Sequence, residues 1–153
     1  MSTYREKLWP SAWLYIATGL VIPASLLVFL PINVFVGVAV AIALYAACVA
    51  ALLIGSPVVE VTSTHFIAGR ARLPLAITGT AEAFDGIEAS AERGQRLDAR
   101  AWLLIRGWVS PVVKVAVNDA ADPAPYWIVS SRHPEAVVAA IVAAKAAAPA
   151  QSV

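Results

Sequence analysis

Charged side chains are absent from about a third of this 153-residue chain. No Asp, Glu, Lys or Arg occurs in the 52 residues between Lys7 and Glu60, and charged residues make up only 14% of the whole. With a mean hydropathy of +0.76, this composition is typical of membrane proteins. From Gly55 onward the chain holds nine basic and nine acidic residues. This neutral balance argues against nucleic-acid binding driven by bulk charge.

Cysteine and the common catalytic motifs are also scarce. Cys48 is the single cysteine, which excludes an intrachain disulfide and a thiolate-rich metal site and favours a small apolar packing residue. The sequence contains no GxSxG, HExxH, GxxxxGK[ST], GxGxxG or CxxC motif. His65 and His133 are far apart and have no ligand spacing around them. We therefore expect no cofactor, no metal and no enzymatic activity.

The uncharged interval has the length of two transmembrane helices. A bilayer core of about 30 Å needs roughly 20 apolar residues. Pro31-Ile32-Asn33 divides the interval, because a proline pushes Leu30 out of the helical region and Asn33 suits a helix N-cap. The pattern predicts a hairpin with spans at Trp9–Leu30 and Asn33–Ile54, closed by Gly55-Ser56-Pro57, and Pro23 is expected to kink the first span.

The flanking charges predict the orientation. Arg5 and Lys7 precede the first span, Arg70 and Arg72 follow the second, and the connecting turn has no Lys or Arg. The positive-inside rule therefore predicts a multi-pass protein of the plasma (cell) membrane with both termini in the cytoplasm. A cleaved signal peptide is the alternative, but the first apolar run is too long and a second follows at once. No ionisable group lies at membrane depth, which disfavours a transporter or channel.

Small residues recur every four positions in the second span, at Ala39, Ala43, Ala47 and Ala51. This spacing places them on one helical stripe, where another backbone can approach closely. One interpretation is packing against the first span of the same chain. The other is contact with a second protomer or with the helix of a membrane-protein partner.

Beyond Pro57 the pattern predicts a small α+β domain in the cytoplasm. β-type runs occur at residues 58–62, 66–69, 70–84 (one or two strands with a proline at an edge or bulge), 101–108, 112–117 and 126–131. Asp85 and Glu88 have capping-box spacing and Gly94 is a stop signal, which predicts a helix at Gly86–Arg93. A second helix is expected from Pro134 to about residue 148 with Val137, Ile141 and Ala144 on one face.

This order of elements suggests a pleckstrin-homology-like β-roll or barrel closed by the C-terminal helix. We expect a transmembrane hairpin at 1–55, the β-rich domain at 56–148 and a disordered tail at 149–153. Glu88 and Glu92 are expected on a solvated helix face.

Four sequence blocks resemble a known family. They are YREKLWPSAW before the first span, GRARLPL after the second, DARAWLLIRGWVSPVVKVAV, and DPAPYWIVSSRHPE. In this order they resemble the domain of unknown function 3093 family, small membrane proteins of actinobacteria, over nearly the whole chain. The resemblance implies an integral membrane protein with a two-helix N-terminus and does not imply an activity.

The candidate binding residues precede the C-terminal helix. Ser130, Ser131, Arg132 and His133 combine hydroxyls and a guanidinium with the free amides of a helix N-terminus, which suits an anion or an acidic partner. The alternative is that Ser131 and His133 cap the helix while Arg132 pairs with Asp119 or Asp122. Arg70 and Arg72 are further candidates for lipid headgroups, although both also serve as positive-inside determinants.

Two classes of function fit this sequence. The first is a non-enzymatic, membrane-anchored interaction or scaffold module, or an accessory subunit of a membrane complex, with the bilayer, a membrane protein or a second copy of the chain as partner. The alternative is a lipid- or anion-binding protein, or an enzyme, with a pocket between the β-domain and the bilayer.

Overall fold

The structure is a computed structural model that describes residues 2–147. It divides the chain into two units: a helical hairpin at Trp9–Ser56, and a β-domain that combines the residues up to Leu8 with those from Pro57 onward. The predicted tail at 149–153 lies outside the described residues.

The hairpin consists of three helical segments, α1 (Ala12–Thr18), α2 (Val21–Phe29) and α3 (Val34–Ile54). Ala12–Phe29 and α3, with 18 and 21 residues, have the length and apolar composition needed to cross a membrane. The predicted N-cap is confirmed, because the Asn33 side chain accepts the backbone N–H groups of Phe35 and Val36. Leu30, however, keeps helical dihedral angles (φ −53°, ψ −42°), so its expected departure from the helix is wrong.

The predicted effect of Pro23 appears one turn before the proline. Pro23 has no N–H to donate to the carbonyl of Gly19, four residues earlier, and its ring crowds that carbonyl. The Ile22 N–H bonds Gly19 O instead (3.0 Å), and the Leu20 N–H bonds Ala17 O (3.1 Å). These shorter-range bonds separate α1 from α2.

The alanine stripe of α3 does not pack against the first span. Ala39, Ala43, Ala47 and Ala51 are exposed, whereas Gly37 and Ala41 are buried. A Cβ at Gly37 would lie 3.2 Å from Phe29 Cβ, so the missing side chain allows this close approach. Residues two positions apart are separated by about 200° around a helix. The stripe therefore faces away from α2, and its contact with a second chain stays a prediction.

The β-domain contains two four-stranded sheets. The first has the order β1-β2-β3-β4 and comprises β1 (Ser2–Lys7), β2 (Val58–Thr62), β3 (His65–Ala68) and β4 (Ala71–Pro74). A 3-10 turn, η1 (Leu75–Ile77), leads to the second. The second has the order β5-β7-β8-β6 and comprises β5 (Thr78–Phe84), β6 (Trp102–Leu104), β7 (Val112–Val117) and β8 (Tyr126–Ser130). Pro74 lies in the edge strand β4, as its missing N–H requires.

Strand β1 is the main difference from the sequence-based prediction. Residues 2–7 were assigned to the membrane hairpin, yet they pair antiparallel with β2, with Lys7 opposite Val58. Tyr4, Glu6 and Leu8 share one face because side chains alternate along a strand. Leu8 is fully buried in the core of the β-domain, and Tyr4 packs against that core. The helical hairpin is therefore inserted between two hydrogen-bonded strands of one sheet.

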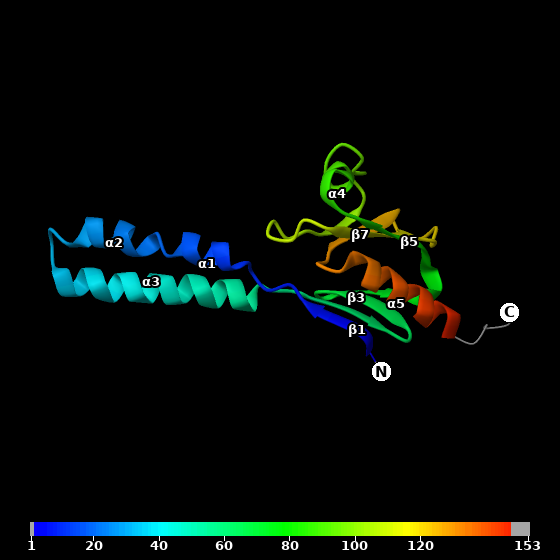
Figure 1. The fold of residues 1–153 in the computed structure, drawn as a ribbon, viewed down its shortest axis with the longest axis horizontal. Helices are drawn as coiled ribbons and strands as arrows, with labels where there is room; N and C mark the ends of the chain where they lie inside the picture. Colours follow the sequence, from blue (N-terminus) through cyan, green and yellow to red (C-terminus); the bar gives the residue numbers. More distant parts are fainter. Residues whose placement is uncertain (1, 148–153) are drawn as a thin grey trace. The chain divides into compact units, whose positions relative to one another are not determined.

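Two helices cover the sheets (Figure 1). α5 (Pro134–Ala147) buries Val137, Ile141 and Ala144, as predicted, in a core shared with residues of both sheets. α4 (Gly86–Arg93) begins and ends where the sequence predicted and contributes Ala89 to a second, smaller cluster. The second sheet is thus covered on both faces, which explains the nearly continuous burial along β8.

The predicted strand at 101–108 is shortened to β6, which pairs in parallel with β8. After Leu104 the backbone leaves the sheet, and the Arg106 N–H donates to the Ser130 hydroxyl at 3.0 Å. The Val109 N–H then bonds the Arg106 carbonyl at 2.9 Å and closes a turn. The buried Ser130 hydroxyl therefore accepts the Arg106 N–H at the point where the apolar pattern predicted that the strand would continue.

Candidate functional site

The predicted anion site holds an anion from the chain itself. Glu6 of β1 reaches the β8–α5 loop, where its Oε2 accepts the Ser131 hydroxyl (2.6 Å) and its Oε1 accepts the Arg132 backbone N–H (2.9 Å). The Tyr4 hydroxyl donates to the same Oε2 at 3.0 Å. Hydroxyl and amide donors therefore converge on a carboxylate, as the SSRH motif suggested. The carboxylate comes from 125 positions away in the sequence.

Tyr4 stays protonated in this cluster. Burial raises the pKa of Tyr4 to about 12, and the neighbouring Glu6 carboxylate also raises it, whereas the hydrogen bond with Ser131 opposes the shift. A protonated phenol can donate to Glu6 throughout the physiological pH range. Two hydrogen bonds to the Glu6 carboxylate, from Ser131 and from the Arg132 N–H, thus link β1 to the loop before α5, and the Tyr4 hydroxyl adds a third within β1.

Ser130 and Ser131 are structural residues. Both are fully buried. Ser130 accepts the Arg106 N–H, and the Ser131 oxygen accepts the His133 N–H at 3.1 Å while its proton goes to Glu6. The expectation that Ser131 stabilises the start of the helix is therefore closer to the structure than direct ligand binding.

Arg132 and His133 line an open pocket of about 360 Å³ beside the N-terminus of α5. Its wall also includes the carboxylates of Asp85 and Glu135, together with Phe84, Pro111 and other apolar or small residues. Asp85 uses one oxygen to accept the Gly86 N–H at 2.6 Å. Because Asp85 and Glu135 line the same pocket as Arg132, a free phosphate or carboxylate would meet like charges there.

The other predicted contacts do not join this pocket. Arg70 and Arg72 belong to the β3–β4 hairpin of the first sheet and are not among the residues that line it. Asp119 and Asp122 lie before the start of β8 and Arg132 lies after its end, so this strand separates the groups whose pairing was the alternative. Each of these Asp side chains accepts a backbone N–H of its own loop, from Ala121 and Ala124 respectively.

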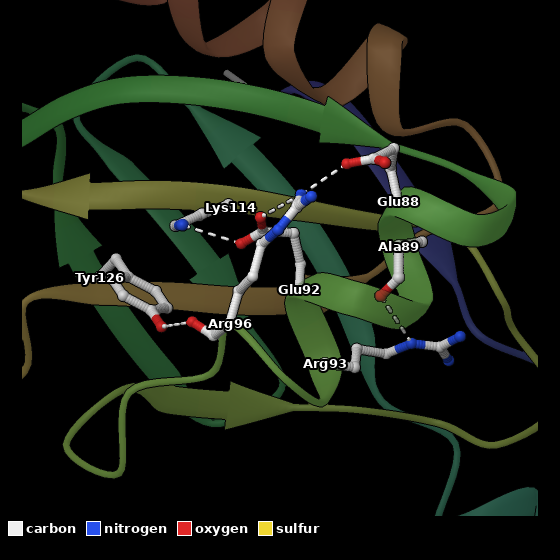
Figure 2. A network of polar contacts seen from close by, with 7 residues as sticks. All are labelled: Glu88, Ala89, Glu92, Arg93, Arg96, Lys114 and Tyr126. Atoms are coloured by element: carbon white, nitrogen blue, oxygen red, sulfur yellow. Dashed lines mark hydrogen bonds and ion pairs between the residues drawn. The ribbon is translucent and has the colours of Figure 1, made fainter.

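A polar network, which the sequence did not predict, fixes α4 on the second sheet (Figure 2). Glu92 is only 4% exposed, and its Oε2 accepts the Lys114 ammonium of β7 at 2.8 Å. Its Oε1 accepts Arg96 at 3.3 Å, and Arg96 also pairs with Glu88. The Lys114 nitrogen lies 4.5 Å from the ring centroid of Tyr126, in cation–π range.

The prediction that Glu88 and Glu92 lie on a solvated helix face is therefore wrong for Glu92. Arg96 lies between the two carboxylates and offsets their repulsion, and Lys114 neutralises the buried one. The hydrogen bond from Lys114 holds the pKa of Glu92 below its usual value of 4.5 despite burial, and Arg96 adds to this effect. The signal available in the sequence was Lys114, a cation on a half-apolar strand.

The neighbouring aromatic residues Tyr126 and Trp127 lie on opposite faces of the second sheet. Trp127 packs in the main core, with ring centroids 4.1 Å from Trp102 and 6.3 Å from Phe66. Tyr126 packs against the smaller cluster, and its hydroxyl accepts the Asp98 N–H at 2.6 Å. Within residues 2–147, no three His, Cys, Asp or Glu residues come together in a way that could hold a metal ion.

These features define a protein class in which an apolar helical hairpin follows the first strand of a two-sheet β-domain. The chain belongs to the DUF3093 family, described as proteins of unknown function, whose family model matches residues 3–141. The match runs from β1 into α5 and confirms the resemblance noted in the sequence blocks. Searches of curated proteins and of solved structures returned no match to the chain.

Glu6→Gln should destabilise the β-domain by about 1–3 kcal/mol, because it replaces a charged acceptor of three hydrogen bonds by a neutral one. Chemical unfolding in detergent, monitored by tryptophan fluorescence, measures this change in the free energy of unfolding. Glu82→Gln, at an exposed position of β5, is the matched control and should change the free energy of unfolding by less than about 0.5 kcal/mol. Equal effects of the two substitutions would show that the Glu6 cluster is not stabilising.

Glu92 should make the β-domain sensitive to acid. Its folded pKa is depressed, so its contribution is present above the unfolded value of about 4.5 and is lost as the pH falls through the folded pKa. Glu92→Gln should cost about 1–3 kcal/mol at pH 7 and reduce the loss of stability below pH 4.5. Unfolding curves between pH 3 and 7 measure both effects.

Glu88→Gln provides the control for Glu92, because it removes an exposed carboxylate from the same Arg96. Its side chain is 58% exposed, and the cost should stay below about 1 kcal/mol. If Glu92→Gln lost as much stability below pH 4.5 as the wild-type chain, Glu92 would not be the source of the acid sensitivity.

Proposed function

We propose that this protein is a membrane-anchored, non-enzymatic interaction module, or an accessory subunit of a membrane complex. The observation that carries the proposal is the helical hairpin, two apolar segments inserted between paired strands. Their large apolar side chains are exposed, with Leu27 at 76% and Phe35 at 86%. In water such a surface would be strongly unfavourable, whereas in lipid it needs no further partner.

The polar side chains of the hairpin also suit a lipid environment. Thr18 donates its hydroxyl to Leu14 O (2.7 Å) and Ser25 donates to Val21 O (2.7 Å), so both groups are satisfied within their own helices. In hydrocarbon, a polar group without such a bond costs several kcal/mol. These bonds support the bilayer as the environment of the hairpin.

Strand pairing supports an even number of membrane crossings. β1 and β2 are hydrogen-bonded neighbours, so residues 2–7 and 58–62 lie on one side of any membrane that the hairpin crosses. Arg5, Lys7, Arg70 and Arg72 favour the cytoplasm as that side. The plasma membrane is the expected location, with both ends of the chain cytoplasmic.

The β-domain supports an interaction role. Two sheets closed by a C-terminal helix are consistent with the pleckstrin-homology-like architecture that we propose for it. The alternative, an anion- or lipid-binding pocket or an enzyme, has weaker support, since Glu6 already uses the Ser131 and Arg132 donors and the α5 pocket carries two carboxylates. Activity at such a site would first require displacement of Glu6.

Cysteine labelling in intact cells tests the anchor. In a Cys48→Ala background, Ile32→Cys in the α2–α3 turn should react with a membrane-impermeant maleimide from outside, because Ile32 is 76% exposed at the hairpin tip. Thr3→Cys and Ala121→Cys should react only after permeabilisation. Labelling of Ile32→Cys and Ala121→Cys from the same side would show that the hairpin does not cross the membrane.

Purification of the full chain in mild detergent tests the module itself. A second membrane protein should accompany it in a constant ratio, and chemical crosslinking before solubilisation should preserve that ratio. Recovery of the chain alone, both with and without crosslinking, would contradict an accessory-subunit role.

A further inference from the structure

Two loops of the β-domain meet where the chain leaves this domain for the hairpin. The Leu8 N–H donates to Pro57 O at 2.9 Å, so the last residue before the hairpin is bonded to the first residue after it. Trp108, in the β6–β7 loop, donates its indole N–H to Leu8 O at 3.3 Å. Gly69, in the β3–β4 turn, donates its N–H to Val58 O at 2.7 Å. The β6–β7 loop therefore lies beside Leu8, and the β3–β4 turn lies beside Val58, so both are close to the ends of the β-domain that continue into the hairpin.

The β3–β4 turn also lies close to the end of β6, where the β6–β7 loop begins. A Cβ at Gly69 would lie 3.7 Å from Leu104 at the end of β6, and 3.6 Å from Pro57. Gly69 has φ +63°, a left-handed conformation that glycine adopts readily, and this tight turn presents Arg70 at the surface. The β3–β4 turn therefore lies beside the point where the chain passes from β6 into the β6–β7 loop.

This part of the β-domain surface is basic and contains an aromatic residue. The segments 68–72 (AGRAR) and 105–111 (IRGWVSP) contain three arginines and no Asp or Glu. Arg70 and Gly107 are exposed, and Arg106 is half-exposed with its guanidinium 6.0 Å from the Trp108 ring. Arginine and tryptophan side chains of this kind favour the headgroup region of a bilayer.

We propose that Arg70, Arg106, Gly107 and Trp108, here called the anchor-side surface, dock on anionic phospholipid headgroups. This inference rests on the proposed membrane anchoring. Three residues separate Leu8 from α1 and two separate Ile54 from Pro57. Because a three-residue connection spans at most about 11 Å, a hairpin that crosses the bilayer holds this surface near the headgroups.

The small number of cations is sufficient because the domain is tethered. Strong binding from solution uses clusters of four to eight Lys or Arg residues. A tethered domain, by contrast, experiences an effective lipid concentration of the order of millimolar or higher. Weak contacts then suffice to select one orientation of the β-domain on the membrane. Docking of this kind fixes which faces of the domain stay available to a partner.

A label on the loop tip measures docking directly. The full chain with Cys48→Ala and Gly107→Cys carries a fluorophore at position 107, where an added side chain meets no atom within 4 Å. It is reconstituted in nanodiscs of zwitterionic lipid alone or with about 30% anionic lipid, both containing a headgroup spin label as quencher. Quenching should be at least twofold stronger in anionic discs and should be lost near 1 M salt, where the screening length falls to about 3 Å.

Two kinds of control test separately the contribution of the arginine charges and the position of the label. Arg70→Gln and Arg106→Gln should each lower the docked-to-undocked ratio by about fivefold, whereas Arg70→Lys should retain it. Ala121→Cys lies in the loop at the other end of β7 and provides the matched position. Its label should show little quenching in either lipid.

The outcomes separate this inference from the proposed function. Failure of the wild-type chain to enter nanodiscs would overturn the membrane anchor itself. Incorporation with equal quenching at positions 107 and 121, or with equal quenching at 107 in both lipids, would overturn the docking inference and leave the anchor intact. Stronger quenching at 107 in anionic discs, lowered by each glutamine variant and retained in Arg70→Lys, supports it.

Discussion

The antiparallel pairing of β1 with β2 is the constraint on which the rest of this structure depends. It closes the ends of a long apolar insertion, because Lys7 lies opposite Val58 and the Leu8 N–H bonds Pro57 O. The sheet therefore holds Leu8 and Pro57, the residues on either side of the hairpin, next to each other. The same strand carries Leu8 into the core and Glu6 to the β8–α5 loop. One edge strand thus joins the apolar hairpin to the loop before the C-terminal helix.

The β-domain uses two of its acidic groups, Glu6 and Glu92, for internal contacts. Glu6 accepts three hydrogen bonds, and Glu92 is bonded to Lys114 and Arg96. Such groups stabilise the fold because removal of one partner would leave a charge or donor without compensation. Their donors are consequently occupied and do not form a vacant recognition site. This arrangement agrees with the interaction module proposed above, which would use the outer surfaces of the domain.

Features set by neighbouring residues were predictable from the sequence. Asn33 caps α3, α4 spans Gly86–Arg93, β7 spans Val112–Val117 and α5 begins at Pro134, because capping, alternation and proline geometry act over a few residues. Features that need distant partners were not predictable. The segment STYREK has too mixed a pattern to identify an edge strand whose partner is more than 50 residues away. The sequence also left open which face of α3 contacts α2, and the structure places Gly37 there instead of the alanine stripe.

The sequence alone determined the apolar hairpin, the break near Pro23 and most of the regular elements, because composition and local spacing encode them, and the family is shown by the match of its model to residues 3–141. Only the tertiary structure decided what the motif SSRH does. Its hydroxyl and amide donors were correctly recognised as suited to an anion, but the anion is Glu6, 125 positions before Ser131. Strand pairing brings that carboxylate to the loop, and no local pattern encodes which distant charge will fill a local group of donors.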